Sequence, residues 1–484
     1  MRKAVTVALA GTAAAAAAGA GMALADPNRR THLRRSARVW RLTARRGLSW
    51  AVLKVRGHGA DDEKRARLEE QFAVRTAEDV ARELGNMKGV IMKAGQMVSF
   101  IADGLPPDAK AALATLQADV SPMAPSLAEG VVLRELGDTV RRLFLDWDPI
   151  PVAAASIGQV HRAVLPDGRE VAVKVQYPGV DRAIKSDLDN AELLYGLFSS
   201  FALKGLDAKA LVDELRDRMG DELDYRLEGR CQAEFAARYR GHPFIHVPEV
   251  VPERSSRRVL TSEWVDGRRW QEFVDSADTA TRQRAGEVMF RFAQGSVHRH
   301  RVFNGDPHPG NYLFHDDGSV TFLDFGLVKR WSVGELEQLV PVLDALLAHD
   351  AKATVRCLVA AGFLAPAHGL DPEAVWEYVS GPYEPYLVER FTFTREWTSQ
   401  ALARALDLSG PSAKVVKRLD MPPSFVILDR GVWGMAALLG RLEATGNWRG
   451  ILDEYRKGAP PVTPLGHEET AWMATYSATA AGGR

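Results

Sequence analysis

The spacing of hydrophobic and polar positions predicts helices first and a β-rich region afterwards. Residues 61 to 145 mix charged and apolar positions with helical periodicity, and Gly104-Leu105-Pro106-Pro107 breaks the pattern. From about residue 150 the runs become β-rich, and Pro166-Asp167-Gly168 joins two of them as a hairpin. Pro178-Gly179 ends the second predicted strand. A helical segment is therefore expected to lead into a small sheet.

Farther along the chain, the pattern predicts a strand between two helical regions. A helical stretch extends from about 183 to 240, and "RRVLTSEWVDG" then predicts a strand that ends in a turn at Asp266-Gly267. Helices resume, and after 330 the pattern is mainly helical to about 457. The last 25 residues have no clear pattern and are expected to be frayed. This order of elements favours an α+β fold with two lobes.

Composition adds limits on compartment and partners. The 484 residues are 46% hydrophobic, which is enough for a large core and for two or three structural units. Lys plus Arg and Asp plus Glu both total 62, so the net charge favours no nucleic-acid partner. Cys231 and Cys357 are the only cysteines, too few for a disulfide framework, and they indicate a reducing compartment.

The N-terminal region carries conflicting signals. Arg2 and Lys3 precede an Ala/Gly-rich run that closes with Ala23-Leu24-Ala25, a pattern typical of a secretory signal. Residues 29 to 46 then hold eight arginines and no acid, a block that is expected to stay on the cytoplasmic side. Four of these arginines fall at helical spacing, so we expect a cytoplasmic protein with a basic helix on the inner face of the membrane, or else a solvated charged tail. The four are Arg34, Arg38, Arg41 and Arg45.

The candidate chemistry comes from four polar residues in a fixed order. Phosphoryl transfer needs a cation at the nucleotide phosphates, metal ligands and a carboxylate that orients the attacking group. Lys174 ends a "VAVK" strand, Asp306 and Asn311 are five positions apart, and Asp324-Phe325-Gly326 begins eighteen positions after Asp306. Each residue alone is typical of an ordinary strand lysine or turn residue. Together they predict a protein-kinase-like fold and a phosphoryl-transfer site.

The predicted nucleotide loop lacks the usual glycines. Where a kinase has its Gly-rich loop, this chain has "PVAAASIGQVHRA", with Ala153, Ala154 and Ala155 followed by Ser156. Because alanine disfavours positive φ angles, this loop is expected to be stiffer and to hold phosphates differently. The alternative is a small-residue turn before a strand.

The chain resembles the UbiB/AarF family of atypical kinases, the ubiquinone-biosynthesis group, over roughly residues 80 to 455. The resemblance rests on several motifs, which are "KAGQ", "AAASIGQVHRA", "VAVKVQYPGV", "ELDYRLE", "DPHPGN", "DFG" and the C-terminal "PPSFVILDRGVWGMAALLGRLEATGNW". It implies that Lys174 pairs with Glu228 and binds nucleotide phosphates. Asp306 would be the catalytic-loop carboxylate, and Asn311 and Asp324 would hold magnesium.

Two further sites are implied by the resemblance. Backbone groups from Glu263 to Val265 would bind adenine. The "KAGQ" helix would fold over the site where a protein kinase takes its peptide, so that Lys93 and Gln96 group with Glu222. Lys93 and Gln96 are three positions apart and share a helix face. A surface pair of Glu222 with Arg226 and a solvated Lys93 are the alternatives.

The sequence departs from the family pattern in two places. Many members have His two residues before the catalytic-loop Asp, whereas this chain has Asn304, which cannot titrate near neutral pH. A proton-relay role at that position is therefore in doubt. The C-terminal membrane segments that are frequent in the family are also absent from this sequence.

These observations predict five parts along the chain. They are an Ala-rich and basic region (1–60), a helical extension (61–145), an N-lobe with hinge (146–267), a helical C-lobe (268–457) and a flexible tail (458–484). The resemblance implies an ATP-binding, magnesium-dependent atypical kinase-like protein, acting as an ATPase or small-molecule phosphotransferase in isoprenoid-quinone or other lipid metabolism. Its partners would be ATP or ADP and a lipid or quinone-precursor ligand. The alternatives are a protein kinase with an Ala-rich nucleotide loop and a non-catalytic, nucleotide-dependent scaffold for a biosynthetic complex.

Overall fold

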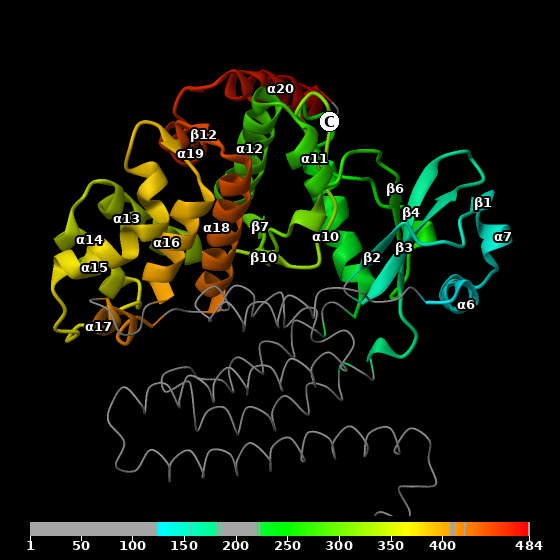
Figure 1. Cartoon of the computed structure of the whole chain (residues 1–484), viewed down its shortest axis with the longest axis horizontal. Coiled ribbons are helices and arrows are strands. Elements are labelled where there is room, and N and C mark those ends of the chain that lie inside the picture. Colours follow the sequence, from blue (N-terminus) through cyan, green and yellow to red (C-terminus); the bar gives the residue numbers. More distant parts are fainter. Residues whose placement is uncertain are drawn as a thin grey trace, which may run out of the picture. The chain divides into compact units, whose positions relative to one another are not determined.

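The computed structural model in Figure 1 describes residues 123–155, 157–181, 184, 220, 223–406, 412–420 and 423–482. Nearly all of them belong to one of the two compact units of the chain, which comprises Phe100–Gly104, Ser121–Pro178 and Gly220–Arg484. None of the helices in these described ranges combines the length and the apolar character needed to cross a bilayer.

A five-stranded antiparallel sheet forms the β-rich lobe. The strands pair in the order β1-β3-β4-β6, and β2 pairs with β3 as well. Their bounds are β1 Asp146–Trp147, β2 Ala153–Ala155, β3 Gly158–Val164, β4 Glu170–Gln176 and β6 Val259–Glu263. The predicted hairpin is confirmed, because Gly168 has a φ of 88° in the turn between β3 and β4.

Alternation along β4 separates the core of this lobe from its functional face. Val171, Val173 and Val175 are buried against α6 (Pro125–Leu136), together with Val259 of β6. The intervening Lys174 points to the opposite face, as the two-residue period of a strand requires. A second short helix, α7 (Val140–Leu143), connects α6 to the sheet.

The expectation that the three alanines lie in a nucleotide loop is wrong. Ala153, Ala154 and Ala155 form strand β2, and Ala155 lies opposite Gly158 in β3. A Cβ on Gly158 would lie 2.3 Å from the carbonyl oxygen of Val175, so this glycine allows β3 and β4 to approach closely. Small residues here therefore serve the pairing of β2, β3 and β4.

Helix α10 (Tyr225–Arg238) packs beside the sheet. Asp224 caps its N-terminus by accepting a hydrogen bond from the Arg226 backbone N–H. The face made of Tyr225, Glu228, Gln232 and Phe235 is buried and has helical spacing. This face carries Glu228 towards the sheet.

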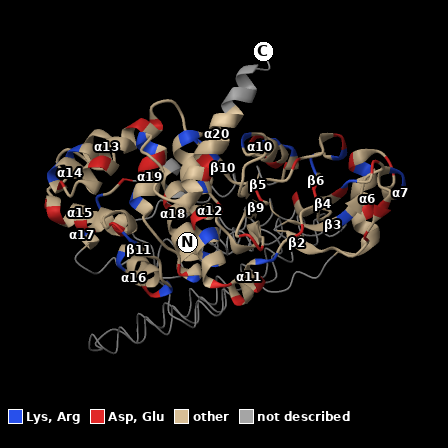
Figure 2. Ribbon diagram, turned by 90° about the horizontal axis from the view of Figure 1, so that it is seen from above, with Lys and Arg blue, Asp and Glu red and all other residues tan. Residues whose placement is uncertain are grey.

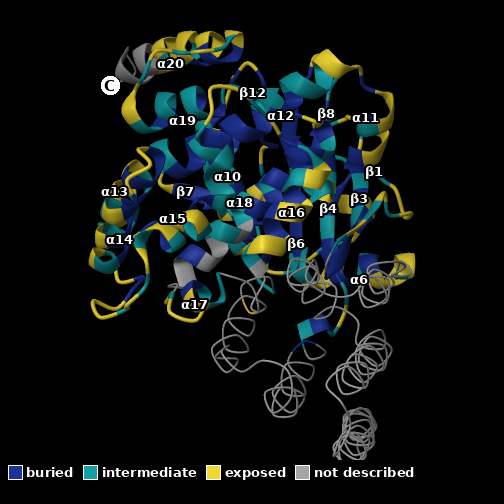
Figure 3. Cartoon of the chain, turned by 60° about the vertical axis from the view of Figure 1, so that its left-hand side comes forward, coloured by how far each residue is buried: buried dark blue, intermediate teal, exposed yellow. Residues whose placement is uncertain are grey.

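The second lobe is mainly helical. Its core surrounds α12 and α18, which lie side by side in Figure 1, and Figure 3 shows buried residues concentrated around α12. In Figure 2 basic and acidic residues are interspersed along the described helices. The helices are α11 Trp270–Ser276, α12 Thr279–Gln294, α13 Glu335–Leu347, α14 Ala351–Ala360, α15 Pro372–Ser380, α16 Arg395–Leu406, α17 Ala413–Val416, α18 Pro423–Leu442, α19 Trp448–Lys457 and α20 Pro464–Gly482.

Short strands and turns complete this lobe and position the candidate site. One sheet pairs β7 with β10, another has the order β5-β9-β8, and a third pairs β11 with β12. The strands are β5 Ile245–His246, β7 Val302–Asn304, β8 Tyr312–Phe314, β9 Val320–Phe322, β10 Val328–Arg330, β11 Phe391–Thr392 and β12 Thr445–Gly446. Short 3₁₀-helices are η2 Pro252–Arg254, η4 Pro309–Asn311 and η5 Gly381–Tyr386, and η3 (Gly295–Arg299) is a π-helical turn that continues α12. Asp317-Gly318 forms the turn between β8 and β9, as an Asp-Gly pair favours, with Gly318 at a φ of 78°.

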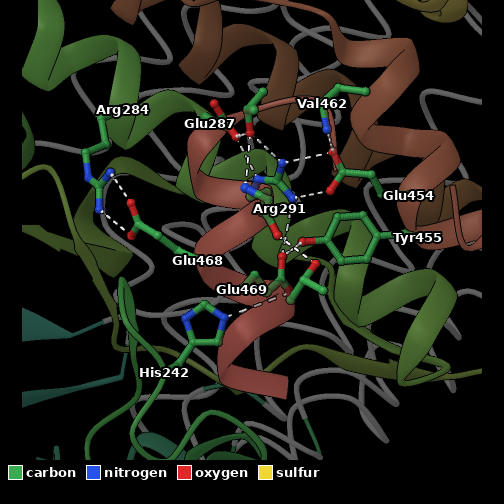
Figure 4. A network of polar contacts seen from close by, with 12 residues as sticks. His242, Arg284, Glu287, Arg291, Glu454, Tyr455, Val462, Glu468 and Glu469 are labelled. Carbon is green, nitrogen blue, oxygen red and sulfur yellow. Dashed lines mark hydrogen bonds and ion pairs between the residues drawn. The ribbon is translucent and has the colours of Figure 1, made fainter. Parts of the chain in front are cut away.

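The expectation of a flexible tail from 458 onwards is wrong. Residues Pro464–Gly482 form helix α20, whose Leu465 and Glu469 are buried at 3% and 4% exposure. Glu469 accepts hydrogen bonds from the guanidinium groups of Arg291 in α12 (3.3 Å) and Arg299 in η3 (2.6 Å), as Figure 4 shows for Arg291. Charged contacts with residues far back in the chain therefore hold α20 in place.

The buried Arg291 is the centre of this network. Its side chain is fully buried, and it also donates to Glu287 of α12 (2.7 Å) and to Glu454 of α19 (2.8 Å). Three carboxylates and the Thr463 hydroxyl (2.8 Å) thus accept from the donors of one guanidinium, which is the arrangement that a buried charge requires.

Candidate active site

A buried ion pair joins the sheet to α10. The Lys174 ammonium donates to both carboxylate oxygens of Glu228, at 2.7 and 2.9 Å, and lies 3.7 Å from Asp324. The Tyr225 ring lies beneath the same ammonium, 5.0 Å from Nζ to the ring centroid. Burial alone favours neutral lysine, but the charges of Glu228 and Asp324 outweigh it and raise the pKa of Lys174 well above its ordinary value. Lys174 therefore keeps its positive charge.

The segment between β7 and β8 positions Asp306 and Asn311. Asp306 is 6% exposed, and its carbonyl oxygen accepts a hydrogen bond from the Asn311 side-chain amide at 3.0 Å. The Asn311 carbonyl oxygen in turn accepts from the Leu323 N–H at 3.0 Å. Because Leu323 immediately precedes Asp324, this bond places Asn311 next to the start of the Asp-Phe-Gly segment.

Asn304 links the two parts of the site. Its side-chain amide donates to the carbonyl oxygen of Asp324, and its side-chain oxygen accepts from the backbone N–H of Asp306 at 3.0 Å. A neutral amide can do both at once, since it carries a donor and an acceptor. Asn304, at the position where the resemblance implies a histidine, is therefore a structural bridge between the Asp306 segment and Asp324.

The Asp-Phe-Gly segment is fixed to α10. One carboxylate oxygen of Asp324 accepts from the Gly326 N–H at 2.9 Å, and the Phe325 ring packs 4.8 Å from the ring of Phe235. Phe325 is 1% exposed. The helix that supplies Glu228 thus also holds the segment that supplies Asp324.

The predicted adenine segment has specific backbone contacts. The Trp264 N–H donates to the Glu170 carbonyl at 3.1 Å, and the Glu263 N–H donates to the Glu249 carbonyl at 2.8 Å. The Glu263 carboxylate lies 3.2 Å from His246, and the hydrogen bond with His246 lowers the pKa of Glu263. Within the described ranges, the Val265 backbone makes no hydrogen bond to another backbone group. Val265 is therefore better placed than Glu263 for its backbone to bind an adenine base.

The predicted nucleotide-contacting alanines lie in the same sheet as Lys174. Ala153 is paired with Val160, and Val160 is paired with Lys174, so the three residues form one row across β2, β3 and β4. Ser156 lies outside the described residues. Lys93, Gln96 and Glu222, which the resemblance groups together, also lie outside them. Arg226, the alternative partner of Glu222, forms an ion pair with Asp224 at 2.6 Å.

Sequence reasoning missed one contact that supports the site. Glu234 of α10 accepts from Arg238 at 2.5 Å and also pairs with Arg330 of β10. The four-residue spacing of Glu234 and Arg238 was a visible helical signal, but the contact with Arg330 depends on the fold. Helix α10 is therefore tied to the strand that follows the Asp-Phe-Gly segment.

The donor set suits magnesium bound together with a nucleotide. Within the described part of the chain, no group of three or more His, Cys, Asp or Glu side chains could hold a metal ion by itself. Asp324 and Asn311 supply a carboxylate and an amide oxygen, which are the oxygen ligands that Mg²⁺ prefers. The remaining positions would be taken by phosphate oxygens and water, as is usual for magnesium at nucleotide sites.

Comparison with known proteins points to one family. The model of the ABC1 atypical kinase-like domain matches residues 115–358. The chain is 32% identical over 308 residues to an uncharacterized Synechocystis protein, covering 63% of this chain and 54% of that protein. It is 30% identical over 298 residues to the atypical kinase COQ8, mitochondrial, of Saccharomyces cerevisiae, covering 61% of this chain and 58% of that protein. With the probable protein kinase UbiB of Marinobacter nauticus it shares 30% over 291 residues, covering 57% and 52%.

The chain matches about half the length of these curated relatives. Among solved structures, that of Rv3197 in complex with erythromycin, from Mycobacterium tuberculosis, matches with a TM-score of 0.60 and 31% identity. That match covers 82% of this chain and 98% of the other.

Proposed function

The chain belongs to the ABC1 atypical kinase-like family, and from this premise we propose that it binds ATP with magnesium and transfers or hydrolyses the γ-phosphate. Family membership confirms the resemblance to UbiB and AarF proteins and the predicted α+β, protein-kinase-like fold. The observation that carries the proposal is the Lys174–Glu228 pair with Asp324 at 3.7 Å. Phosphoryl-transfer sites use such a cation to bind phosphates beside a metal-binding carboxylate.

Each side chain has a proposed role in this reaction. Lys174, held in place by Glu228, would contact the nucleotide phosphates. Asp324 and Asn311 would hold magnesium, which supplies charge neutralisation at the phosphates when bound. Asp306, fixed by its backbone contacts to Asn304 and Asn311, would orient the attacking hydroxyl or water and accept its proton. Backbone groups near Val265 would bind adenine.

The short segment after Gly326 favours an ATPase or small-molecule phosphotransferase over a protein kinase. In protein kinases an activation loop lies between the Asp-Phe-Gly and Ala-Pro-Glu motifs. Here β10 pairs with β7 almost at once, α13 begins at Glu335, and the sequence has no Ala-Pro-Glu motif. The residues from 327 to 334 leave little room for a peptide-binding platform. The proposed link to isoprenoid-quinone or other lipid metabolism rests on family membership.

The test of turnover is phosphate release by the purified chain with Mg-ATP. A measurable rate that requires magnesium would support the enzyme. Tight ATP binding without phosphate release, with and without lipid vesicles, would instead favour the non-catalytic scaffold. Phosphorylation of generic peptides would favour the protein-kinase alternative over the proposed function.

Replacement of Asp324 by Asn is expected to weaken nucleotide binding in the presence of magnesium by about 10- to 100-fold, which is about 1.4–2.7 kcal/mol. The variant loses the negative charge that attracts the metal but keeps the side-chain oxygen that accepts from Gly326. Titration of ATP with and without magnesium measures the effect. Asp316→Asn is the matched control, because the Asp316 side chain is 98% exposed in the β8–β9 turn. Equal magnesium-dependent affinities for both variants, at unchanged thermal stability, would remove Asp324 from the metal site.

A further inference from the structure

A largely apolar cavity of about 260 Å³ lies in the helical lobe. Side chains from α12, η3, α13 and α18 line it, among them Phe290, Val297, Leu343 and Leu439. An apolar cavity of about 150 Å³ is large enough to bind benzene. This one therefore has room for a molecule clearly larger than a single aromatic ring.

The cavity meets the catalytic loop from the side of the helical lobe. Asn304, Pro307, Asn311 and Tyr312 are among its lining residues. Lys174, Glu228 and Asp324 are not among the described residues that line it. The cavity thus lies apart from Lys174, Glu228 and Asp324, although Asn311, a proposed magnesium ligand, and the loop that carries Asp306 form part of its wall.

A few polar side chains interrupt the apolar lining. Asp429 of α18 faces it, and burial raises the pKa of this carboxyl to about 6, against the effect of a hydrogen bond with Trp433. Arg456 lies at the lining with its side chain 4% exposed, and its Nη2 pairs with Asp344 at 2.7 Å. The Nε and Nη1 atoms of Arg456 have no hydrogen-bond partner among the described residues. Tyr383 also lines the cavity, and burial raises the pKa of its hydroxyl to about 12, with a further rise from Asp429 and a lowering by Arg456.

We propose that this cavity is a binding site for a neutral, mainly apolar molecule that carries one hydroxyl or carbonyl oxygen. The apolar walls supply most of the binding, and a few polar groups orient the ligand, as in small-molecule sites generally. A ligand oxygen near Arg456 would provide an acceptor for donors that now lack one.

The charges of the lining select against ions of either sign. A carboxylate ligand would place a second negative charge beside Asp429, in surroundings that already disfavour the first. A cationic ligand would meet Arg456, which cannot lose its proton. The attraction of Arg456 for anions is reduced because Asp344 and Asp453 already lie 2.7 and 3.7 Å from its guanidinium. The charges of the lining therefore favour a ligand whose oxygen is neutral.

A comparison of 1-decanol with decanoate at pH 7.5, on nucleotide-free protein, tests this choice. Both have the same chain length, so they differ in charge at the polar end. We expect 1-decanol to bind and to raise the melting temperature, and decanoate to bind at least about tenfold more weakly. In Asp429→Asn, which keeps the shape of the side chain, the difference should shrink to about threefold or less. Equal binding of the two ligands by the unmodified protein, or an unchanged ratio in Asp429→Asn, would overturn the proposal.

Filling the cavity tests its location. Gly431 in α18 lines the cavity, and a Cβ placed there meets only Phe303, at 4.0 Å. Gly431→Leu therefore adds bulk without a close contact at Cβ, and leucine is the better helix former, so the variant should fold. We expect it to weaken 1-decanol binding at least about tenfold, because the leucine takes up space that the ligand needs.

Gly130→Leu in α6 is the matched control, since a Cβ there meets only the flexible end of Arg134 at 3.4 Å, in the other lobe. It should bind 1-decanol like the unmodified protein. Undiminished binding by Gly431→Leu would show that the ligand sits elsewhere and would reject the cavity as its site. Because no nucleotide is present, this result leaves the proposed ATP site untouched.

Discussion

Asp306→Asn is expected to lower the rate of phosphate release by about 10²- to 10⁴-fold while ATP affinity stays within about twofold. The backbone of Asp306 is fixed by Asn304 and Asn311, so the substitution should leave the loop in place. Asparagine retains the size of the side chain but cannot accept a proton from the attacking group. An interaction that matters mainly in the transition state changes turnover and spares ground-state binding.

Single-turnover phosphate release and an ATP titration of the same preparation measure the two quantities. A fall in affinity equal to the fall in rate would assign Asp306 to substrate binding instead. An unchanged rate in a variant that still binds ATP would show that another group accepts the proton, or that phosphate release comes from a contaminant.

Glu469→Gln is expected to lower the free energy of unfolding by about 3 kcal/mol near neutral pH. The substitution removes the carboxylate that Arg299 contacts at 2.6 Å and one of the carboxylates around the buried Arg291. Burial alone would favour protonated Glu469, but His242, Arg299, Tyr455 and Arg291 outweigh it and lower its pKa from 4.5 to about 2. Urea unfolding followed by fluorescence measures the loss.

The same pKa shift predicts a pH dependence. Because the folded-state pKa of Glu469 lies below its unfolded value, its contribution is fully present above pH 4.5 and disappears as the pH falls towards 2. As the pH falls from 4.5 to about 2, the free energy of unfolding should therefore decrease less in Glu469→Gln than in the unmodified protein.

Glu468→Gln is the control for Glu469. Glu468 is the neighbouring residue of α20, and it forms a surface pair with Arg284 at 3.1 Å, with the two side chains 42% and 32% exposed. A pair of this kind contributes about 0–1 kcal/mol. If the two variants were equally stable, α20 would be held by its apolar contacts, and the buried charges would contribute nothing net.

The features that sequence predicted correctly are encoded over short distances. An Asp-Gly pair favours a hairpin turn from local sequence alone, as at Gly168 and Gly318, because glycine adopts positive φ at little cost. The spacing of Asp306, Asn311 and Asp324 follows from one loop and one hairpin. Local rules therefore account for the proximity of Asp306, Asn311 and Asp324, whereas the Lys174–Glu228 pair spans 54 positions and was expected only from the family resemblance.

The features that sequence missed depend on contacts between distant residues. Helix α20 has many small and polar residues and no clear apolar stripe, so its helicity depends on docking through Glu469. The three alanines from 153 onwards looked like a loop because small residues are common in loops, but pairing with β3 makes them a strand. The bridge that Asn304 forms to Asp324 crosses twenty positions and had no local signal.

The docking of α20 also bears on how the protein is made. Arg291 finds Glu454 and Glu469 at separations of 163 and 178 residues. A ribosome that adds about 5–20 residues per second needs on the order of ten seconds or more to bridge such a distance. Throughout that time α12 has been synthesised, but the guanidinium of Arg291 lacks the carboxylates of Glu454 and Glu469. The helical lobe therefore cannot complete its packing around Arg291. We expect the lobe to stay open to chaperones and proteases until residue 469 has left the exit tunnel, and chains cut short before α20 to be degraded as unfinished products.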